Sequence, residues 1–250
     1  MTVFRQIATR LPEESLIYLG DTARVPYGSK SRNTVIRYAQ ACARLLLAQD
    51  IKLLVVACNT ASAFALEALQ DSLEVPVIGV VEPGARAALA RSRNRRIGVI
   101  GTVGAINSGA YTEALQRIEP EVVVHAQACP LFVPLAEEGW THGEVPRKVA
   151  DAYLQGLLAE GIDTLVLGCT HYPLLKDTIQ ETLGPKVTLV DSAEETAVTV
   201  AQCVTEMRLS AAPGVMPLHR FLVSDAPESF QRVSRHFLQM PLLAVEWVDF

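Results

Sequence analysis

Two of the five cysteines stand where a thiol could take part in proton transfer. Cys58 follows the apolar run Leu53–Ala57, and Cys169 follows the run Thr164–Leu167 and one glycine. A helical pattern comes after each cysteine, so we expect both thiols at a turn from a strand to a helix N-terminus. The partial positive charge there favours an anion and would lower the pKa of each thiol below its free value of about 8.5.

The spacing of the cysteines argues against a zinc or redox motif, because no two of them form a C-x-x-C pair. Two facing thiols could instead do acid–base work. One would remove a proton while the other donates one from the opposite side, which inverts a stereocentre. A disulfide would need Cα atoms within roughly 7 Å and would leave no room for a substrate. The other three cysteines are expected to be structural: Cys42, Cys129 and Cys203.

Polar residues beside the two cysteines could hold a carboxylate or assist a thiol. Asn59 and Thr60 follow the first cysteine, and Thr170 and His171 follow the second. Amide, hydroxyl and helix N-terminal N–H groups together suit a carboxylate. His171, with an ordinary pKa of about 6.5, could polarise or protonate near its thiol, although a capping or core role is the alternative.

Other candidate functional residues lie in less specific sequence patterns. Thr102 lies in the segment Gly101–Gly104, which is a weak anion-loop pattern. Glu137 lies at an expected border between a helix and a loop, where a solvated carboxylate is the simplest interpretation. The remaining histidines have no supporting residues around them and are expected to be structural: His125, His142, His219 and His236.

The elements that must position these residues alternate between short apolar runs and longer amphipathic stretches. The runs predict strands that are covered by helices on both faces of parallel sheets, that is, an α/β fold of three layers. Active groups should then lie beyond the carboxyl ends of the strands. The expected strands are Leu16–Leu19, Leu53–Ala57, Val75–Val81, Ile97–Ile100, Val122–His125, Thr164–Leu167, Val187–Val190 and Phe221–Val223. The expected helices are Thr2–Arg10, Ser31–Gln49, Ala61–Ser72, Gly84–Arg91, Ser108–Ile118, Pro146–Glu160, Leu174–Leu183, Glu194–Met207 and Glu228–Leu238.

An internal repeat predicts two similar halves. The residues that end in Cys58 resemble those that end in Cys169, and the segment before Asp21 resembles the one before Asp191. We therefore expect two pseudo-symmetric α/β domains with one cysteine on each wall of a shared cleft. The first domain would comprise residues 1–82 and 196–250, and the second would comprise residues 83–195.

The composition excludes several classes of protein. The chain has 250 residues, of which 50% are hydrophobic, and a formal net charge of −5. A disordered chain would be more polar, and a protein that binds nucleic acid through phosphates would be basic. No run approaches the roughly 18 apolar residues of a membrane span, and the first residues lack the apolar core of a signal peptide. Free thiols in an odd number fit a reducing compartment, so we expect a cytoplasmic protein.

Four segments resemble the glutamate racemase family, within the cofactor-independent aspartate/glutamate racemase superfamily. They are Tyr18-Leu-Gly-Asp-Thr-Ala-Arg-Val-Pro-Tyr-Gly28, Ala57-Cys-Asn-Thr-Ala-Ser62, Cys129-Pro-Leu-Phe-Val-Pro-Leu-Ala-Glu137 and Gly168-Cys-Thr-His-Tyr-Pro-Leu-Leu175. The resemblance implies interconversion of L- and D-glutamate, which supplies D-glutamate for peptidoglycan in the cytoplasm. It also implies a homodimer, with no pyridoxal phosphate, other cofactor or metal.

The resemblance also implies roles for individual residues. Cys58 and Cys169 would be the two proton donors and acceptors, assisted by His171 and Glu137. The residues expected to bind substrate are Asp21, Tyr27, Gly28, Asn59, Thr60, Thr102, Thr170 and His171.

The chain departs from the family pattern at two places. Family members begin with a strand that ends in Asp-Ser-Gly, whereas this sequence begins at the following helix, so we expect the first domain to lack that strand. Ala105 stands where many members have threonine, which removes one expected hydroxyl contact. Two other functions stay open: a truncated, inert chain that at most binds glutamate or a protein partner, and a relative that acts on another amino acid.

Overall fold

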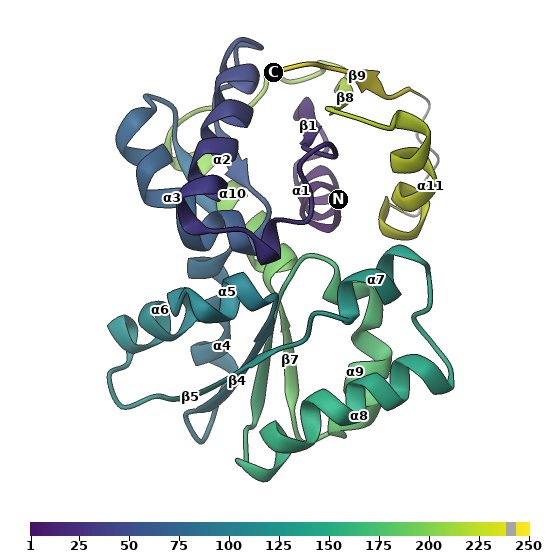
Figure 1. The fold of residues 1–250 in the computed structure, drawn as a ribbon. Helices are drawn as coiled ribbons and strands as arrows, with labels where there is room; N and C mark the ends of the chain where they lie inside the picture. The colour runs from purple at the N-terminus through teal and green to yellow at the C-terminus, as the bar shows by residue number, and fades with distance from the viewer. Residues whose placement is uncertain (239–243) are drawn as a thin grey trace.

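A parallel four-stranded sheet forms the centre of one half of the molecule (Figure 1). The computed structural model describes residues 1–238 and 244–250. The sheet has the order β5-β4-β6-β7, with the strands β4 (Arg96–Gly101), β5 (Val123–Ala128), β6 (Thr164–Gly168) and β7 (Thr188–Asp191). Every residue of β6 is buried. Since side chains alternate across a sheet, Leu165 and Leu167 enter one core cluster and Val166 enters another on the opposite face.

Helices cover both faces of this sheet and supply the rest of the two cores. Ala88, Tyr111 and Leu115 pack with Val166. Phe132, Leu154 and Ile179 belong to the opposite cluster. The helices are α4 (Val81–Arg91), α5 (Val103–Asn107), α6 (Ala110–Ile118), α7 (Phe132–Glu137), α8 (Glu144–Ala159) and α9 (Lys176–Leu183).

The other half contains five described strands in two separate parallel sheets. One sheet has the order β1-β8-β9, with β1 (Leu16–Gly20), β8 (His219–Val223) and β9 (Glu246–Trp247). The second pairs β2 (Leu54–Val56) with β3 (Val77–Gly79). Around them lie α1 (Thr2–Arg10), α2 (Arg32–Leu47), α3 (Asn59–Ser72), α10 (Ser192–Glu206) and α11 (Pro227–Leu238). Among the described residues, no strand joins β1 to β2.

Two packed helix pairs hold this half together. Val35 and Ala39 of α2 pack with Ala65 and Leu69 of α3 in one cluster. In another cluster, Ile7 and its neighbours on α1 meet the apolar face of α10. Figure 1 shows α1 close to β1, with both chain ends in the same half.

The expected α/β class is confirmed, and each expected strand is present with its ends shifted by a few residues. The expected helix Gly84–Arg91 begins earlier, at Val81, because Pro83 falls in the first turn, where its missing N–H breaks no helical bond. The expected helix Ser108–Ile118 begins at Ala110, after Gly109 at φ +73°, which separates it from α5. The strand β9 was not predicted.

The proposed domain limits place β1, β2, β3, β8 and β9 in one domain and β4 to β7 in the other. Residues 239–243 of the first domain's range lie outside the described residues. Within the part of the chain that the structure describes, no helix is long and apolar enough to cross a membrane.

Candidate active site

Cys58 lies at the turn between β2 and α3, as the sequence predicts. It is the N-cap residue of α3, and its carbonyl oxygen accepts the hydrogen bond from the Ser62 N–H at 2.8 Å. The Cys58 residue is exposed to solvent, although many protein atoms lie around its thiol.

Cys169 follows β6 and leads into the 3₁₀ turn η2 (Tyr172–Leu175), and its residue is only 6% exposed. Burial raises the pKa of the Cys169 thiol to about 12, and negative charge on Cys58 or Glu137 raises it further. The N–H groups of His171 and Tyr172 act in the opposite direction. Since charge on Cys58 raises the pKa of Cys169, the two thiols lie near enough to interact electrostatically.

The expectation of a lowered thiol pKa is wrong in its net direction. The N–H groups of Thr60 and Ala61 and the Thr60 hydroxyl do lower the pKa of Cys58, but burial outweighs them and the pKa is raised. A thiolate that leaves water loses more hydration than a few N–H groups return. The surroundings of both cysteines therefore favour the neutral thiol.

His171 connects Cys169 to Glu137. The imidazole Nδ1 lies 3.7 Å from the Cys169 Sγ, and Nε2 lies 3.1 Å from a Glu137 carboxylate oxygen. Glu137 is the last residue of α7, whereas His171 is the N-cap residue of η2. If Nε2 carries the proton and donates it to Glu137, Nδ1 is free to accept the thiol proton. This arrangement can offset the effect of burial on Cys169.

Polar groups from both halves meet beside Cys58. The hydroxyl oxygens of Thr60 and Thr102 lie 2.8 Å apart, and Thr102 also accepts from the Ala105 N–H as the N-cap residue of α5. Gly28 packs so closely that an added Cβ would lie 2.7 Å from the Thr102 Cβ. The expected residues Gly28, Thr60 and Thr102 are thus brought together.

Asn59 is 2% exposed, and its Nδ2 is buried with no hydrogen-bond partner in the described structure. Its Oδ1 accepts from the Tyr111 hydroxyl at 2.7 Å. A buried amide with two unused donors indicates a place for an acceptor such as a carboxylate oxygen. Tyr111 was not singled out from the sequence, since a tyrosine in an amphipathic helix looks like any core residue.

Asp21 and Tyr27 lie in a separate polar network. Asp21 accepts from the Tyr27 hydroxyl, from Arg24 Nε at 2.8 Å and from Ser224 Oγ at 3.1 Å. No hydrogen bond among the described residues joins this network to Cys58 or Cys169. We therefore expect Asp21 and Tyr27 to contribute to substrate binding through their backbone groups or the shape of the site, because their side chains bond to each other.

The start of α1 lies at the site as well. The Thr2 hydroxyl donates to the Thr170 carbonyl oxygen at 2.9 Å. The α-amino group of Met1 is buried near Cys58, and burial lowers its pKa to about 5. Sequence reasoning did not assign either residue to the site, because nothing local in the sequence says where the first helix docks.

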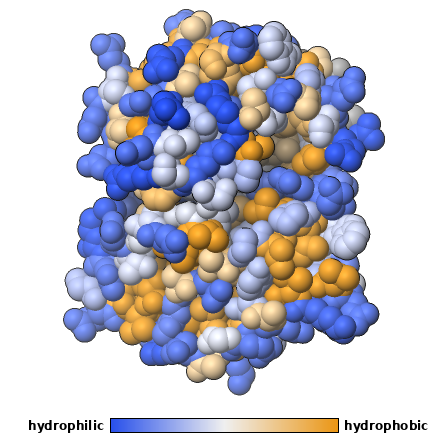
Figure 2. All heavy atoms as spheres, viewed as in Figure 1, coloured by the Kyte–Doolittle hydropathy of each residue, from blue (hydrophilic) through white to orange (hydrophobic). Residues whose placement is uncertain are grey.

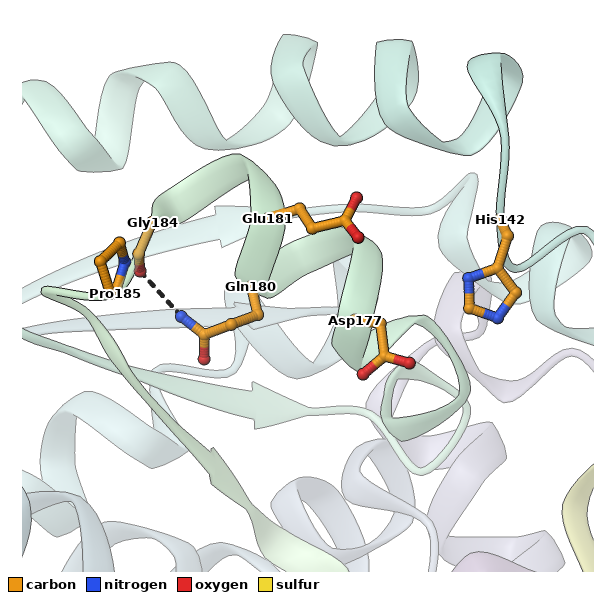
Figure 3. A pocket seen from close by; sticks show the side chains of 6 residues that line it. All are labelled: His142, Asp177, Gln180, Glu181, Gly184 and Pro185. Atoms are coloured by element: carbon orange, nitrogen blue, oxygen red, sulfur yellow. Dashed lines mark hydrogen bonds between the residues drawn. The ribbon is translucent and has the colours of Figure 1, made fainter.

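A pocket elsewhere on the surface contains neither cysteine. It has a volume of about 570 Å³ and lies along α9, where Gln180 Nε2 donates to the Gly184 carbonyl oxygen at 2.8 Å (Figure 3). Its lining residues are His142, Asp177, Gln180, Glu181, Gly184 and Pro185. Among the described residues, no three His, Cys, Asp or Glu side chains are grouped as a metal site requires.

Comparisons with known proteins identify the family. Residues 2–200 match the family described as Asp/Glu/Hydantoin racemase. The chain belongs to this racemase family. It is 58% identical over 238 residues to a glutamate racemase from Geobacter metallireducens, covering 95% of this chain and 88% of the relative. It is 48% identical over 249 residues to one from Syntrophus aciditrophicus, covering 100% of this chain and 92% of the relative.

Solved structures of family members share the fold. Glutamate racemase isoform RacE1 from Bacillus anthracis superposes with a TM-score of 0.95 at 40% identity, covering 99% of this chain and 92% of the other. The glutamate racemase from Francisella tularensis, in complex with D-glutamate, gives a TM-score of 0.93 at 36% identity over the same shares. A Picrophilus torridus aspartate racemase, at 15% identity and a TM-score of 0.56, shares the fold alone.

Proposed function

We propose that the chain interconverts L-glutamate and D-glutamate by two-base proton transfer, with Cys58 and Cys169 on opposite faces of the substrate Cα. The observation that supports the proposal is the electrostatic interaction between two thiols that follow strands of different sheets, β2 and β6. Several relatives with nearly full coverage are glutamate racemases, which supports glutamate as the substrate.

The two cysteines exchange roles with the direction of reaction. In one direction, the thiolate of one cysteine removes the α-proton while the thiol of the other cysteine gives its proton to the opposite face of Cα. In the reverse direction, the second cysteine is the thiolate and the first is the thiol. The raised pKa of both thiols keeps them protonated, so a proton is present to be donated, but it leaves little thiolate to act as the base. The site must therefore stabilise one thiolate when substrate is bound, and the substrate's ammonium group is a suitable cation nearby.

His171 and Glu137 assist Cys169 in this scheme. A proton that leaves the thiol can move to His171 Nδ1, and the imidazolium is then stabilised by the carboxylate of Glu137 at its other nitrogen. On the side of Cys58, the N–H groups at the start of α3 and the Thr60 hydroxyl stabilise the thiolate.

The substrate carboxylate would be held by hydrogen-bond donors beside the two cysteines. Asn59 Nδ2, Thr60, Thr102 and Thr170 supply donors near the cysteines, and Tyr27 and Gly28 would close the site through the backbone. These donors stabilise the negative charge that develops as the α-proton leaves, and burial excludes water that would compete with them. We assign no cofactor or metal to the reaction. D-glutamate made in this way would serve peptidoglycan synthesis in the cytoplasm.

We also propose a homodimer that uses the apolar surface of α7 and α8. Figure 2 shows a cluster of apolar atoms over this part of the molecule. Leu131, Trp140 and Val145 are 52%, 58% and 50% exposed and line one groove with Pro134 and Val149. Large apolar patches commonly mark protein interfaces. Trp140→Glu should shift the sedimenting species to a monomer, whereas Trp247→Glu, at an equally exposed tryptophan of the other half, should not. A wild-type monomer at micromolar concentration would refute this proposal.

The racemase proposal is tested by incubating the protein with L-glutamate in deuterated water. We expect D-glutamate with deuterium at Cα, and activity losses of about 10²–10⁴-fold in Cys58→Ser and Cys169→Ser. Cys203→Ser in α10 is the matched control and should keep full activity. Turnover of aspartate in place of glutamate would support a different substrate, and no turnover of glutamate by a folded protein would refute the proposal.

A further inference from the structure

We infer that Tyr111 is a positioning residue that fixes the orientation of the Asn59 amide and so presents its NH₂ group to the substrate carboxylate. This inference rests on the proposed racemase function and adds a residue to that site. The relevant contact is the 2.7 Å hydrogen bond from the Tyr111 hydroxyl to the Asn59 Oδ1. It joins α6 to the first residue of α3, directly after Cys58.

The direction of this bond decides which end of the amide faces the substrate. Burial raises the pKa of Tyr111 well above its usual value, so the phenol keeps its proton and can donate it. With Oδ1 held by Tyr111, the buried Nδ2 is left with two donors and no partner in the described part of the chain. An amide turned the other way would aim its oxygen at a carboxylate and repel it.

The surroundings of Tyr111 hold its hydroxyl in place. The residue is 4% exposed. A Cβ added at Gly84 of α4 would lie 3.2 Å from the Tyr111 hydroxyl, and one added at Gly168 would lie 3.1 Å from the tyrosine ring. The ring therefore passes between α4 and the strand end that carries Cys169. Tyr111 therefore contacts Asn59, which follows Cys58, and packs against the end of β6, which precedes Cys169.

The test compares Tyr111→Phe with wild type in steady-state racemisation of glutamate. Tyr111→Phe keeps the ring but frees the amide, so we expect KM to rise about tenfold, the value of one net buried hydrogen bond, with a smaller change in kcat. The matched control is Tyr153→Phe, whose hydroxyl accepts from the Leu131 N–H at 3.3 Å outside the site; its KM should stay unchanged. A merely structural tyrosine would lower the melting temperature without this split between KM and kcat.

A double-mutant cycle tests whether Tyr111 acts through Asn59. In an Asn59→Ala background, Tyr111→Phe should have no further effect on KM, and additive effects would overturn the inference. If Tyr111→Phe does not fold, Gly84→Ala serves instead, since its methyl group displaces the hydroxyl and should raise KM in the same way. An unchanged KM in the folded variant also overturns the inference. Wild-type protein that does not racemise glutamate would instead refute the proposed function, so the two failures are distinct.

Discussion

Glu137→Gln separates two opposing effects of one carboxylate. Through space, the charge of Glu137 raises the pKa of Cys169 and so opposes thiolate formation. Through the 3.1 Å contact with His171 Nε2, the same charge stabilises the imidazolium that takes the thiol proton. Removing the charge should speed the reaction if the first effect dominates and slow it if the second does.

We expect the second effect to dominate, because it acts over one direct contact. A hydrogen bond to a charged group contributes about 1.5–3 kcal/mol. The side chains of His171 and Glu137 are 29% and 46% exposed, so screening by water reduces this to about 1 kcal/mol. Glu137→Gln should therefore lower kcat about fivefold, measured by circular dichroism of glutamate across pH 6–9.

The neighbouring Glu138→Gln is the control for a general change of charge, and its kcat should stay within twofold of wild type. A kcat of Glu137→Gln that equals or exceeds wild type, with a pH profile displaced to lower pH, would show that His171 does not carry the proton. It would leave only the through-space effect of the carboxylate.

Three further outcomes follow from the structure. Gly28→Ala should impair turnover, because its Cβ would lie 2.7 Å from Thr102, whereas Gly156→Ala in α8, with nothing within 4 Å, should raise the melting temperature by about 2–4 °C. Burial, and then the charge of Asp21, raises the pKa of Cys42 from 9.0 to about 12. The contribution of the Cys42 thiol to stability is therefore complete below pH 9 and is lost as the pH rises toward 12. In urea titrations from pH 8.5 to 10.5, the stability of Cys42→Ser should therefore fall less steeply than that of wild type. Burial opposes the ionisation of Asp163, but hydrogen bonds from Ser92, Arg93 and Asn94 outweigh it and lower the pKa below 3.8. Asp163→Asn should therefore destabilise the protein at pH 7, and its difference from wild type should shrink below pH 3.8 and vanish once the pH is below the lowered pKa of the folded state. An equal difference at pH 7 and in acid would contradict this origin.

The sequence predicted the parts of the fold that depend on local pattern. The apolar run before Cys58 and the helical pattern after it predicted the strand, the turn and the helix in the right order. The same logic placed Cys169 at the end of β6. Boundaries were less certain where one residue changes the backbone, as at Gly109 with φ +73°.

Properties that depend on packing between distant segments could not be predicted from local pattern. The Thr60–Thr102 contact and the Tyr111–Asn59 bond join residues from different halves. The predicted direction of the thiol pKa shifts was wrong. Helix N-termini can be recognised in a sequence, whereas the desolvation of a thiol depends on what surrounds it after folding. For the same reason the sequence could not show that Asp21 accepts a hydrogen bond from Tyr27.

The two thiols are supported unequally, since a histidine and a carboxylate assist Cys169 whereas N–H groups and a hydroxyl assist Cys58. The two enantiomers of glutamate have the same free energy in water. The Haldane relation then makes kcat/KM equal for the two directions, whatever the residues are. Because of the asymmetry of the site, kcat can differ between the two enantiomers and so can KM, but the ratio kcat/KM must be the same for both. A variant with both a higher kcat and a lower KM for the same enantiomer would point to an error in the measurement.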